Sequence, residues 1–313
     1  MPSPWTVPFD PVLIGAAVTA ITLAAFIGYR SEGPTSRWRP AATTTAAVLL
    51  VACWVSPLQT VASHYLLSGH LLQITLVMGV IPPLFLLGLP ERCSIRLPRT
   101  AARLLRLCVH PVAGMVAVNL AFFAWHSGPA YDLALQSPEV YAAQQVSLLL
   151  ASVMFWWPIV VPLGDRRVLS RWGTLGYILV ATIPQTFAGI TVALVRHPLY
   201  ALYGQAPRLF GLGVLTDQQI AGACIALVSK IALFTAFSVV FLRMLNEPTS
   251  DGDDDDGGGG GGGGRRPTSN TPSPLPSGSV PWLTDLNAGR TVPEPAPAPR
   301  PLRVPAVRGP GRG

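Results

Sequence analysis

Residues 65–89 form an apolar run that is long enough to cross a lipid bilayer, and no other feature restricts the fold as strongly. A membrane-spanning helix needs about 20 mainly apolar residues, and only helices or closed barrels satisfy every backbone hydrogen bond in lipid. Similar segments recur along the chain, separated by short loops that favour an up-and-down bundle. The predicted spans are residues 11–29, 41–61, 65–89, 111–126, 141–163, 174–195 and 217–244. We therefore predict an all-α polytopic membrane protein, a seven-transmembrane-helix bundle.

The composition agrees with a chain that is surrounded by lipid. Of the residues, 50% are hydrophobic and only 12% are charged, and the mean hydropathy is +0.44. These values exclude a soluble globular protein and make the lipid bilayer the expected surroundings. Residues 1–11 lack the basic stretch that opens a cleavable signal peptide, so we expect the first apolar run to be retained as a span.

The basic residues fall mainly in the first, third and fifth connections between spans. These loops hold Arg30, Arg37, Arg39, Arg92, Arg96, Arg99, Arg103, Arg106, Arg166, Arg167 and Arg171. Because cytoplasmic loops of membrane proteins are enriched in Lys and Arg, we predict that the N-terminus lies outside and the C-terminus inside. The formal net charge of +7 is therefore a topology signal, and no nucleic-acid partner is expected.

Two segments outside the spans have a distinctive composition. In the third loop, Leu104, Leu105 and Leu107 stand among arginines, which fits either a short interfacial helix on anionic cytoplasmic lipid or a basic stop signal alone. Residues 246–313 open with an Asp- and Gly-rich run and continue rich in Pro and Ser, so they bury too little apolar surface to fold. We predict a membrane domain over residues 1–245 and a disordered cytoplasmic tail over residues 246–313.

Polar side chains gather at the predicted outer face. His70 and Gln73 lie one helical turn apart inside the third span, where they either hydrogen-bond to neighbouring helices or belong to a metal or cofactor site. With the predicted topology, four of the five histidines face outside, and imidazole is a ligand for copper, zinc and iron. His64 and His197 are equally well explained as solvated loop residues. The candidate metal ligands are His64, His70, His126, Asp132, His197 and Asp217.

The remaining polar and soft side chains give weaker signals. Lys230 lies near the middle of the last span, where a charge is costly and needs a partner such as Gln185 or a residue of another protein. Met78, Met154 and Cys224 are soft metal ligands, but both methionines lie deep in their spans. The chain contains no Walker A loop, GxGxxG or HExxH motif, so we do not expect an enzyme.

Four motifs, in order, resemble the CtaG family of cytochrome c oxidase assembly proteins over about residues 40–245. They are HLLQITLVMGVIPPLFLLGLP at 70–90, WHSGPAYDLAL at 125–135, FWWPIV at 155–160 and DQQIAG at 217–222. The resemblance implies a multi-pass protein of the bacterial plasma membrane that helps to mature a haem–copper oxidase. It also implies that copper is bound transiently, and that the partners are oxidase subunits and an extracytoplasmic copper donor.

The sequence departs from the family pattern at two places. Many members resemble HMxQH in the third span, where this chain has His70 and Gln73 but Ile74 in place of the second histidine. The glutamate–histidine pair that is often seen in the fifth span is matched by Gln144 and Gln145. Two potential ligands are therefore missing. The remaining site is weaker, recruits ligands from a partner, or belongs to a branch that binds no metal.

These observations lead to three hypotheses. The first is a non-enzymatic assembly factor whose outer mouth, with His70, His126 and Asp217, binds copper transiently and presents it to a nascent oxidase subunit. The second is a transporter or channel that moves copper or another small solute through a cavity shaped by prolines within the spans. The third is a scaffold that holds oxidase subunits together without metal.

Overall fold

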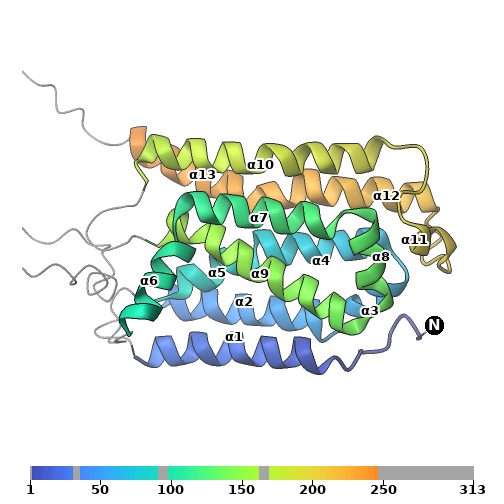
Figure 1. Ribbon diagram of the computed structural model, residues 1–313, viewed down its shortest axis with the longest axis horizontal. Helices are drawn as coiled ribbons and strands as arrows, with labels where there is room; N and C mark the ends of the chain where they lie inside the picture. Colours follow the sequence, from blue (N-terminus) through green and yellow to red (C-terminus); the bar gives the residue numbers. More distant parts are fainter. Residues whose placement is uncertain (1, 31–35, 91–97, 162–168, 246–313) are drawn as a thin grey trace, which may run out of the picture.

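The structure is a bundle of helices that run side by side along its long axis (Figure 1). It is a computed structural model and describes residues 2–30, 36–90, 98–161 and 169–245. Over these ranges it contains helices and no strand, which confirms the all-α prediction. The helices are α1 (Pro11–Tyr29), α2 (Trp38–Trp54), α3 (Pro57–His64), α4 (Leu67–Gly79), α5 (Ile81–Gly88), α6 (Arg99–Cys108), α7 (Pro111–Trp125), α8 (Gly128–Gln136), α9 (Pro138–Val160), α10 (Arg171–Leu194), α11 (Ala201–Gln205), α12 (Val214–Ala223), the π-helical turn η1 (Cys224–Val228) and α13 (Ser229–Leu245).

The helices reproduce the predicted spans. In the described part of the chain, five are long and apolar enough to cross a membrane, and the number is seven if each of two bent pairs counts as one span. The bent pairs are α2 with α3, at 48°, and α6 with α7, at 65°. The predicted span 65–89 is built from α4 and α5, and the predicted span 217–244 from α12, η1 and α13. The seven-span prediction therefore fits the described chain when both bent pairs are counted.

Helix starts follow from capping residues that stand directly before prolines. The Asp10 side chain accepts hydrogen bonds of 2.9 and 3.0 Å from N–H groups in the first turn of α1, and Pro11 is the first helical residue. Ser56 and Pro57 form the same pair at the start of α3. Proline suits this position because the first N–H groups of a helix have no helical partner, and a capping oxygen satisfies those that remain. The second span bends at Ser56 because a new helix starts there.

The two ends of the bundle carry different side chains. At one end, on the left of Figure 1, α1 finishes next to Arg30, α2 starts near Arg39, and α10 starts at Arg171. We name this the arginine end. The chain begins at the opposite end, where α3, α8 and α11 lie, and we name this the histidine end after His64 and His126. The described arginines beside the first, third and fifth connections thus lie at a single end of the bundle.

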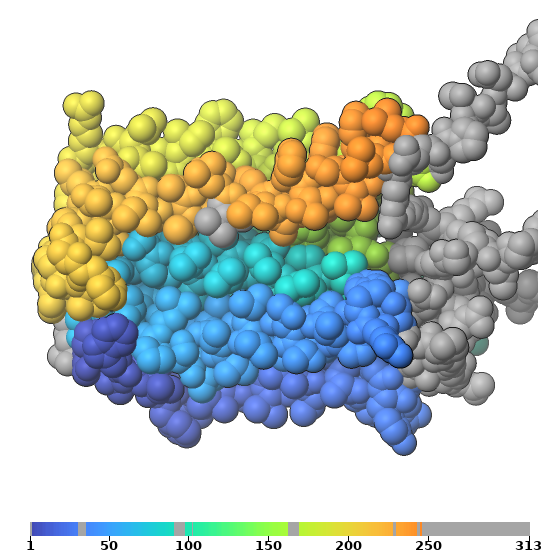
Figure 2. All heavy atoms as spheres, turned by 180° about the vertical axis from the view of Figure 1, so that it is seen from behind, coloured from blue at the N-terminus to red at the C-terminus, as the bar shows by residue number. Residues whose placement is uncertain are grey.

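Helices α4 and α9 form the centre of the bundle. The share of buried residues is 61% in the span made by α4 and α5 and 50% in α9, but 11% in α1 and 19% in the last span. From behind, α4 is seen between the last span on one side and α2 on the other (Figure 2), and it contacts α3, α9 and α12. Because α4 carries His70 and Gln73, other helices surround these two polar side chains.

One segment predicted as a loop is helical. The sequence predicts that Asp132 lies in the loop after the fourth span, whereas it belongs to α8, a helix that Pro129 in its first turn favours. The predicted tail, residues 246–313, lies outside the described residues. The same holds for the loop residues Arg92, Arg96, Arg166 and Arg167.

Candidate functional site

Helix α4 begins against a buried carboxylate from a distant part of the chain. Asp217, in the first turn of α12, accepts hydrogen bonds from the backbone N–H groups of Leu67 (2.8 Å) and Ser68 (3.0 Å) and from the Ser68 hydroxyl. Its side chain is 2% exposed. The first N–H groups of a helix lack partners within the helix and attract negative charge, so Asp217 caps α4. Both carboxylate oxygens bind α4 and fix the helix that carries His70.

Gln73 is held by three hydrogen bonds that determine which way its amide points. Its Nε2 donates to the backbone carbonyl of Cys53 and to Oε1 of Gln59, each at 2.6 Å. A carbonyl oxygen can only accept, so Nε2 must face Cys53 and Oε1 must face the opposite side. There the hydroxyl of Tyr141 donates to Oε1 at 2.6 Å. For Gln73, interhelical hydrogen bonding is therefore the correct interpretation.

The orientation of Gln73 decides the protonation of His70. The Tyr141 oxygen lies 3.4 Å from Nδ1 of His70, and its proton is already committed to Gln73. Nδ1 must therefore carry a hydrogen and donate to Tyr141, which leaves Nε2 with an unprotonated lone pair. The His70 side chain is 0% exposed, and Nε2 has no hydrogen-bond partner among the described residues. The result is a buried, neutral imidazole with a nitrogen lone pair that no described residue uses.

His126, just after α7, has the same arrangement. Its Nδ1 lies 2.7 Å from the backbone carbonyl of Phe122, which can only accept a hydrogen bond. The proton therefore sits on Nδ1, and Nε2 is again buried without a partner in the part of the chain that the structure describes. The ring stacks on Phe122, with 4.2 Å between ring centroids. A hydrogen bond through one nitrogen fixes the tautomer in the same way at the metal-binding histidines of known proteins.

The rings of both histidines lie near Tyr131, on α8. The centroid of the Tyr131 ring is 5.0 Å from that of His70 and 6.0 Å from that of His126. Tyr200, between α10 and α12, stacks on Tyr131 at 3.9 Å and donates a hydrogen bond of 3.2 Å to the backbone carbonyl of His126. Burial raises the pKa of Tyr200 to about 12, so its hydroxyl stays protonated. We name His70, His126, Tyr131, Tyr141, Tyr200 and Tyr203 the tyrosine–histidine cluster.

Comparison with known families identifies the chain. Residues 22–247 match the family of the cytochrome c oxidase caa3 assembly factor (Caa3_CtaG). This chain belongs to that family. The match starts in the second half of α1, earlier than the motifs indicate. Neither a curated protein nor a solved structure matches the chain.

The positions where this CtaG-family protein departs from the HMxQH and glutamate–histidine patterns are all buried. Ile74 is 1% exposed and packs in the hydrophobic core. The carboxamide of Gln144 is buried, and neither its nitrogen nor its oxygen has a partner among the described residues. The carbonyl oxygen of Gln145 accepts a hydrogen bond of 3.2 Å from the indole of Trp54. Gln145 therefore joins α9 to α2, whereas Gln144 is a buried amide with unused hydrogen-bonding capacity.

The other predicted ligands lie at different places. His64 ends α3 and is half-buried, with Nδ1 2.7 Å from the Ser63 hydroxyl. His197 is exposed, and Asp132 is half-buried on α8. In the described ranges, no three His, Cys, Asp or Glu side chains gather closely enough to hold a metal ion. The structure brings His70 and His126 to one aromatic ring, and it does not add a third ligand of these types.

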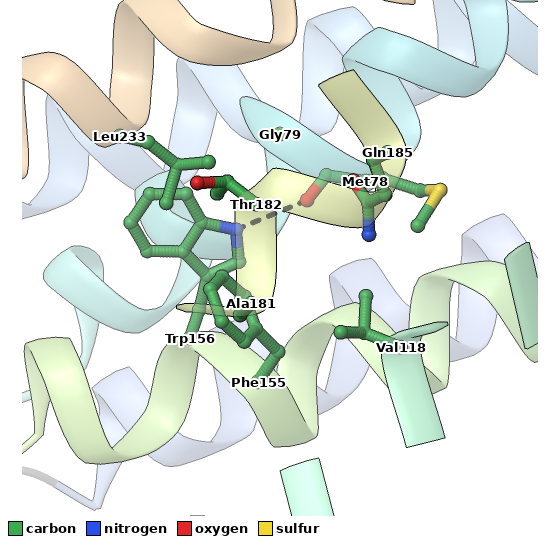
Figure 3. A pocket seen from close by; sticks show the side chains of 9 residues that line it. All are labelled: Met78, Gly79, Val118, Phe155, Trp156, Ala181, Thr182, Gln185 and Leu233. Carbon is green, nitrogen blue, oxygen red and sulfur yellow. Dashed lines mark hydrogen bonds between the residues drawn. The ribbon is translucent and has the colours of Figure 1, made fainter. Parts of the chain in front are cut away.

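A small cavity lies deeper in the bundle, between α4, α7, α9, α10 and α13 (Figure 3). Its volume is about 30 Å³, which is room for one water molecule. Met78, in its wall, is eight residues beyond His70 on α4, or about 12 Å along the helix. Lys230 follows η1, and its buried Nζ has no partner within the described ranges. The lining residues are Met78, Gly79, Val118, Phe155, Trp156, Ala181, Thr182, Gln185 and Leu233.

Proposed function

We propose that this cytochrome c oxidase assembly factor binds copper through His70 and His126 and delivers it to a haem–copper oxidase. The observation that carries the proposal is the pair of buried Nε2 lone pairs, neither of which meets a hydrogen-bond donor among the described residues. A buried polar atom without a partner is costly and uncommon in folded proteins. A metal ion is the partner that two unprotonated imidazole nitrogens suit best.

The chemistry of the pair favours Cu(I) as the cargo. Both ligands are neutral, and imidazole is a ligand for copper, zinc and iron. Zinc sites in proteins use four ligands as a rule, whereas Cu(I) forms stable complexes with two nitrogen ligands. Asp217 supports the site indirectly, because its oxygens cap α4, the helix that carries His70. His70 and His126 would therefore hold the ion, and Asp217, Gln73 and Tyr141 would hold His70.

The arginine end supports copper handling on the extracytoplasmic side of the membrane. Arg39, Arg99, Arg103 and Arg171 lie at that end, and cytoplasmic loops are enriched in such residues. The histidine end then faces the extracytoplasmic side of the bacterial plasma membrane. An extracytoplasmic copper donor would meet the protein there, and the nascent oxidase subunit would receive the ion on the same side.

Copper titration of the detergent-solubilised protein tests the ligands. Cu(I) would be competed against a chromophoric Cu(I) chelator under reducing conditions, with the wild type and the variants His70→Ala and His126→Ala. We expect each substitution to weaken binding by at least about tenfold, since even partners behind the ligands contribute that much. His197→Ala is the matched control, because His197 is an exposed histidine of the same end. Unchanged affinity in both cluster variants would refute the ligand assignment.

Two further measurements separate this proposal from its rivals. In cells that lack the protein, oxidase with normal haem but depleted copper indicates metal delivery. Normal oxidase assembly in a His70→Ala/His126→Ala double variant supports the metal-free scaffold instead. Copper uptake into proteoliposomes that contain the purified protein supports the transporter, since an assembly factor alone produces no flux.

A further inference from the structure

Helix α6 has three distinct faces that the copper-handling proposal does not use. Successive residues of an α-helix are turned by about 100°. Arg99 and Arg103 therefore share one face, where both are exposed, and Arg106 falls on the same side. On the next face, Leu104 and Leu107 are 63% and 65% exposed. The third face carries Leu105, which packs against the hydrophobic core. The helix is thus attached to the bundle by one side and presents leucines and arginines on the other two.

The location and the tilt of α6 suit a helix that lies at the membrane surface. It lies at the arginine end of the bundle (Figure 1), and it is bent by 65° from α7, the helix that covers the predicted fourth span. A helix inclined so strongly to a span lies closer to the membrane plane than to the membrane normal. In a helix at the membrane surface, leucines on one face reach the acyl chains and arginines on the next face reach the phosphates. Amphipathic helices that lie in the membrane interface have this division into apolar and basic faces.

We propose that α6 is a binding site for anionic phospholipid in the leaflet at the arginine end of the protein. The guanidinium groups of Arg99 and Arg103 pair with lipid phosphate, and Leu104 and Leu107 insert beside the acyl chains. The positive charge of the arginine face complements the lipid phosphates, and the exposed leucine face lies directly beside it on the same helix. Arginine suits this role because its planar guanidinium pairs with phosphate through two hydrogen bonds. A basic segment next to a span binds anionic leaflets for the same reason.

Lipid titration of the full-length protein tests the proposal. The protein in neutral detergent would be titrated with phosphatidylglycerol or phosphatidylcholine, and the number of bound lipids counted by native mass spectrometry. We expect saturable binding of phosphatidylglycerol, and the Arg99→Gln/Arg103→Gln variant should weaken it by about thirtyfold, because each basic residue near an anionic surface contributes about fivefold. Phosphatidylcholine binding should not change.

Matched variants separate the site from a general effect of charge. Arg103→Gln and Arg196→Gln remove one positive charge each, at opposite ends of the protein, and Arg196 is exposed. We expect only Arg103→Gln to weaken phosphatidylglycerol binding. Leu104→Ser/Leu107→Ser keeps every charge and should weaken it as well, because the acyl contact is lost. Equal effects of Arg103→Gln and Arg196→Gln would overturn the proposal.

Two other outcomes would also overturn it. If glycerol phosphate displaces phosphatidylglycerol at equal concentration, the site recognises free phosphate and not a lipid surface. If the double arginine variant binds lipid normally but no longer co-purifies with oxidase subunits, α6 is a protein contact. Copper affinity should be the same in all α6 variants, so this proposal and the copper proposal can fail separately.

Discussion

The tyrosine–histidine cluster and the contact between α10 and α12 hold the bundle together in opposite ways. The cluster is joined by side-chain hydrogen bonds and ring contacts, such as that between Tyr141 and Gln73 at 2.6 Å. The α10–α12 contact, which continues into η1, brings backbones together: a Cβ atom added to Gly222 would lie 2.4 Å from the backbone nitrogen of Ala193, and one added to Gly189 would lie 2.8 Å from that of Ala226 in η1. We name Gly189, Ala193, Gly222 and Ala226 the glycine seam.

The difference shows where a membrane bundle has room for function. Apolar surface gains little by moving from lipid to a helix contact, so close packing and interhelical hydrogen bonds drive association. The glycine seam uses close packing alone, and its side chains contain no hydrogen-bonding group. The cluster uses hydrogen bonds and leaves Nε2 of His70 and of His126 without partners among the described residues. We infer that the seam provides stability, while the unused capacity for binding lies in the cluster.

A larger side chain in the glycine seam should have the largest effect on folding. In Gly222→Val, the new side chain would meet backbone atoms that cannot move without separating α10 from α12. We expect a loss of about 3 kcal/mol or more in unfolding free energy, the upper range for overpacking. Unfolding of the purified protein in mixed detergent micelles measures the change. Gly176→Val is the control, because no atom lies within 4 Å of a Cβ added there. If Gly222→Val and Gly176→Val lose the same unfolding free energy, the glycine seam is not closely packed.

Removal of the α4 cap should have the next largest effect. Asp217→Ala leaves the N–H groups of Leu67 and Ser68 buried without their acceptor. We expect a loss of about 2–3 kcal/mol, in the range for hydrogen bonds to a charged group. Asp217→Asn keeps one acceptor oxygen and should lose less. The same unfolding assay provides the measurement, and Asp132→Ala on α8 should cost less than 1 kcal/mol, roughly the change for a site away from such contacts. If Asp217→Ala and Asp132→Ala lose the same unfolding free energy, Asp217 does not stabilise the protein as a cap of α4.

A change behind His70 should have a small effect on stability but a clear effect on copper. Gln73→Leu removes the acceptor of the Tyr141 proton, so Tyr141 can donate to Nδ1 of His70. The imidazole proton then moves to Nε2 and blocks the metal-binding nitrogen. We expect about 1–2 kcal/mol lower stability and about tenfold weaker Cu(I) binding.

A second glutamine provides the control for this experiment. Gln145→Leu removes a buried hydrogen bond to Trp54 of similar kind but leaves Gln73 in place as the acceptor of the Tyr141 proton. It should lower stability by a similar amount and leave Cu(I) affinity unchanged. If both leucine variants weaken copper binding equally, the tautomer of His70 does not explain the weaker binding. A general loosening of the bundle explains it instead.

The sequence alone predicted most of the architecture. Apolar runs define the spans because length and hydropathy are local properties of a chain in lipid. Arginines interleaved with leucines mark α6. The resemblance to the CtaG family, drawn from short motifs, is confirmed over residues 22–247. The metal ligands, the copper cargo and the orientation in the membrane stay predictions.

The sequence did not reveal the tyrosines of the cluster. Tyr131, Tyr200 and Tyr203 lie near the ends of spans, where tyrosine is common as an anchor at the membrane surface. Nothing in the sequence distinguishes such an anchor from a ring that packs against a buried histidine. The helical spacing of Tyr141 and Gln144 on one face of the fifth span was the one available signal, and it indicates burial without naming a neighbour.

Only the tertiary structure decided what the polar residues do. Asp217 caps a helix that begins 150 residues earlier, and the proton of Tyr141 reaches Gln73, 68 residues away. Spacing along a helix places His70 and Gln73 on neighbouring turns, but it does not tell which of them is satisfied. That depends on donors and acceptors from other helices, which meet only when the bundle is packed. The sequence thus determined where the apolar helices lie along the chain, and the packing determined which nitrogen atoms have no partner among the described residues.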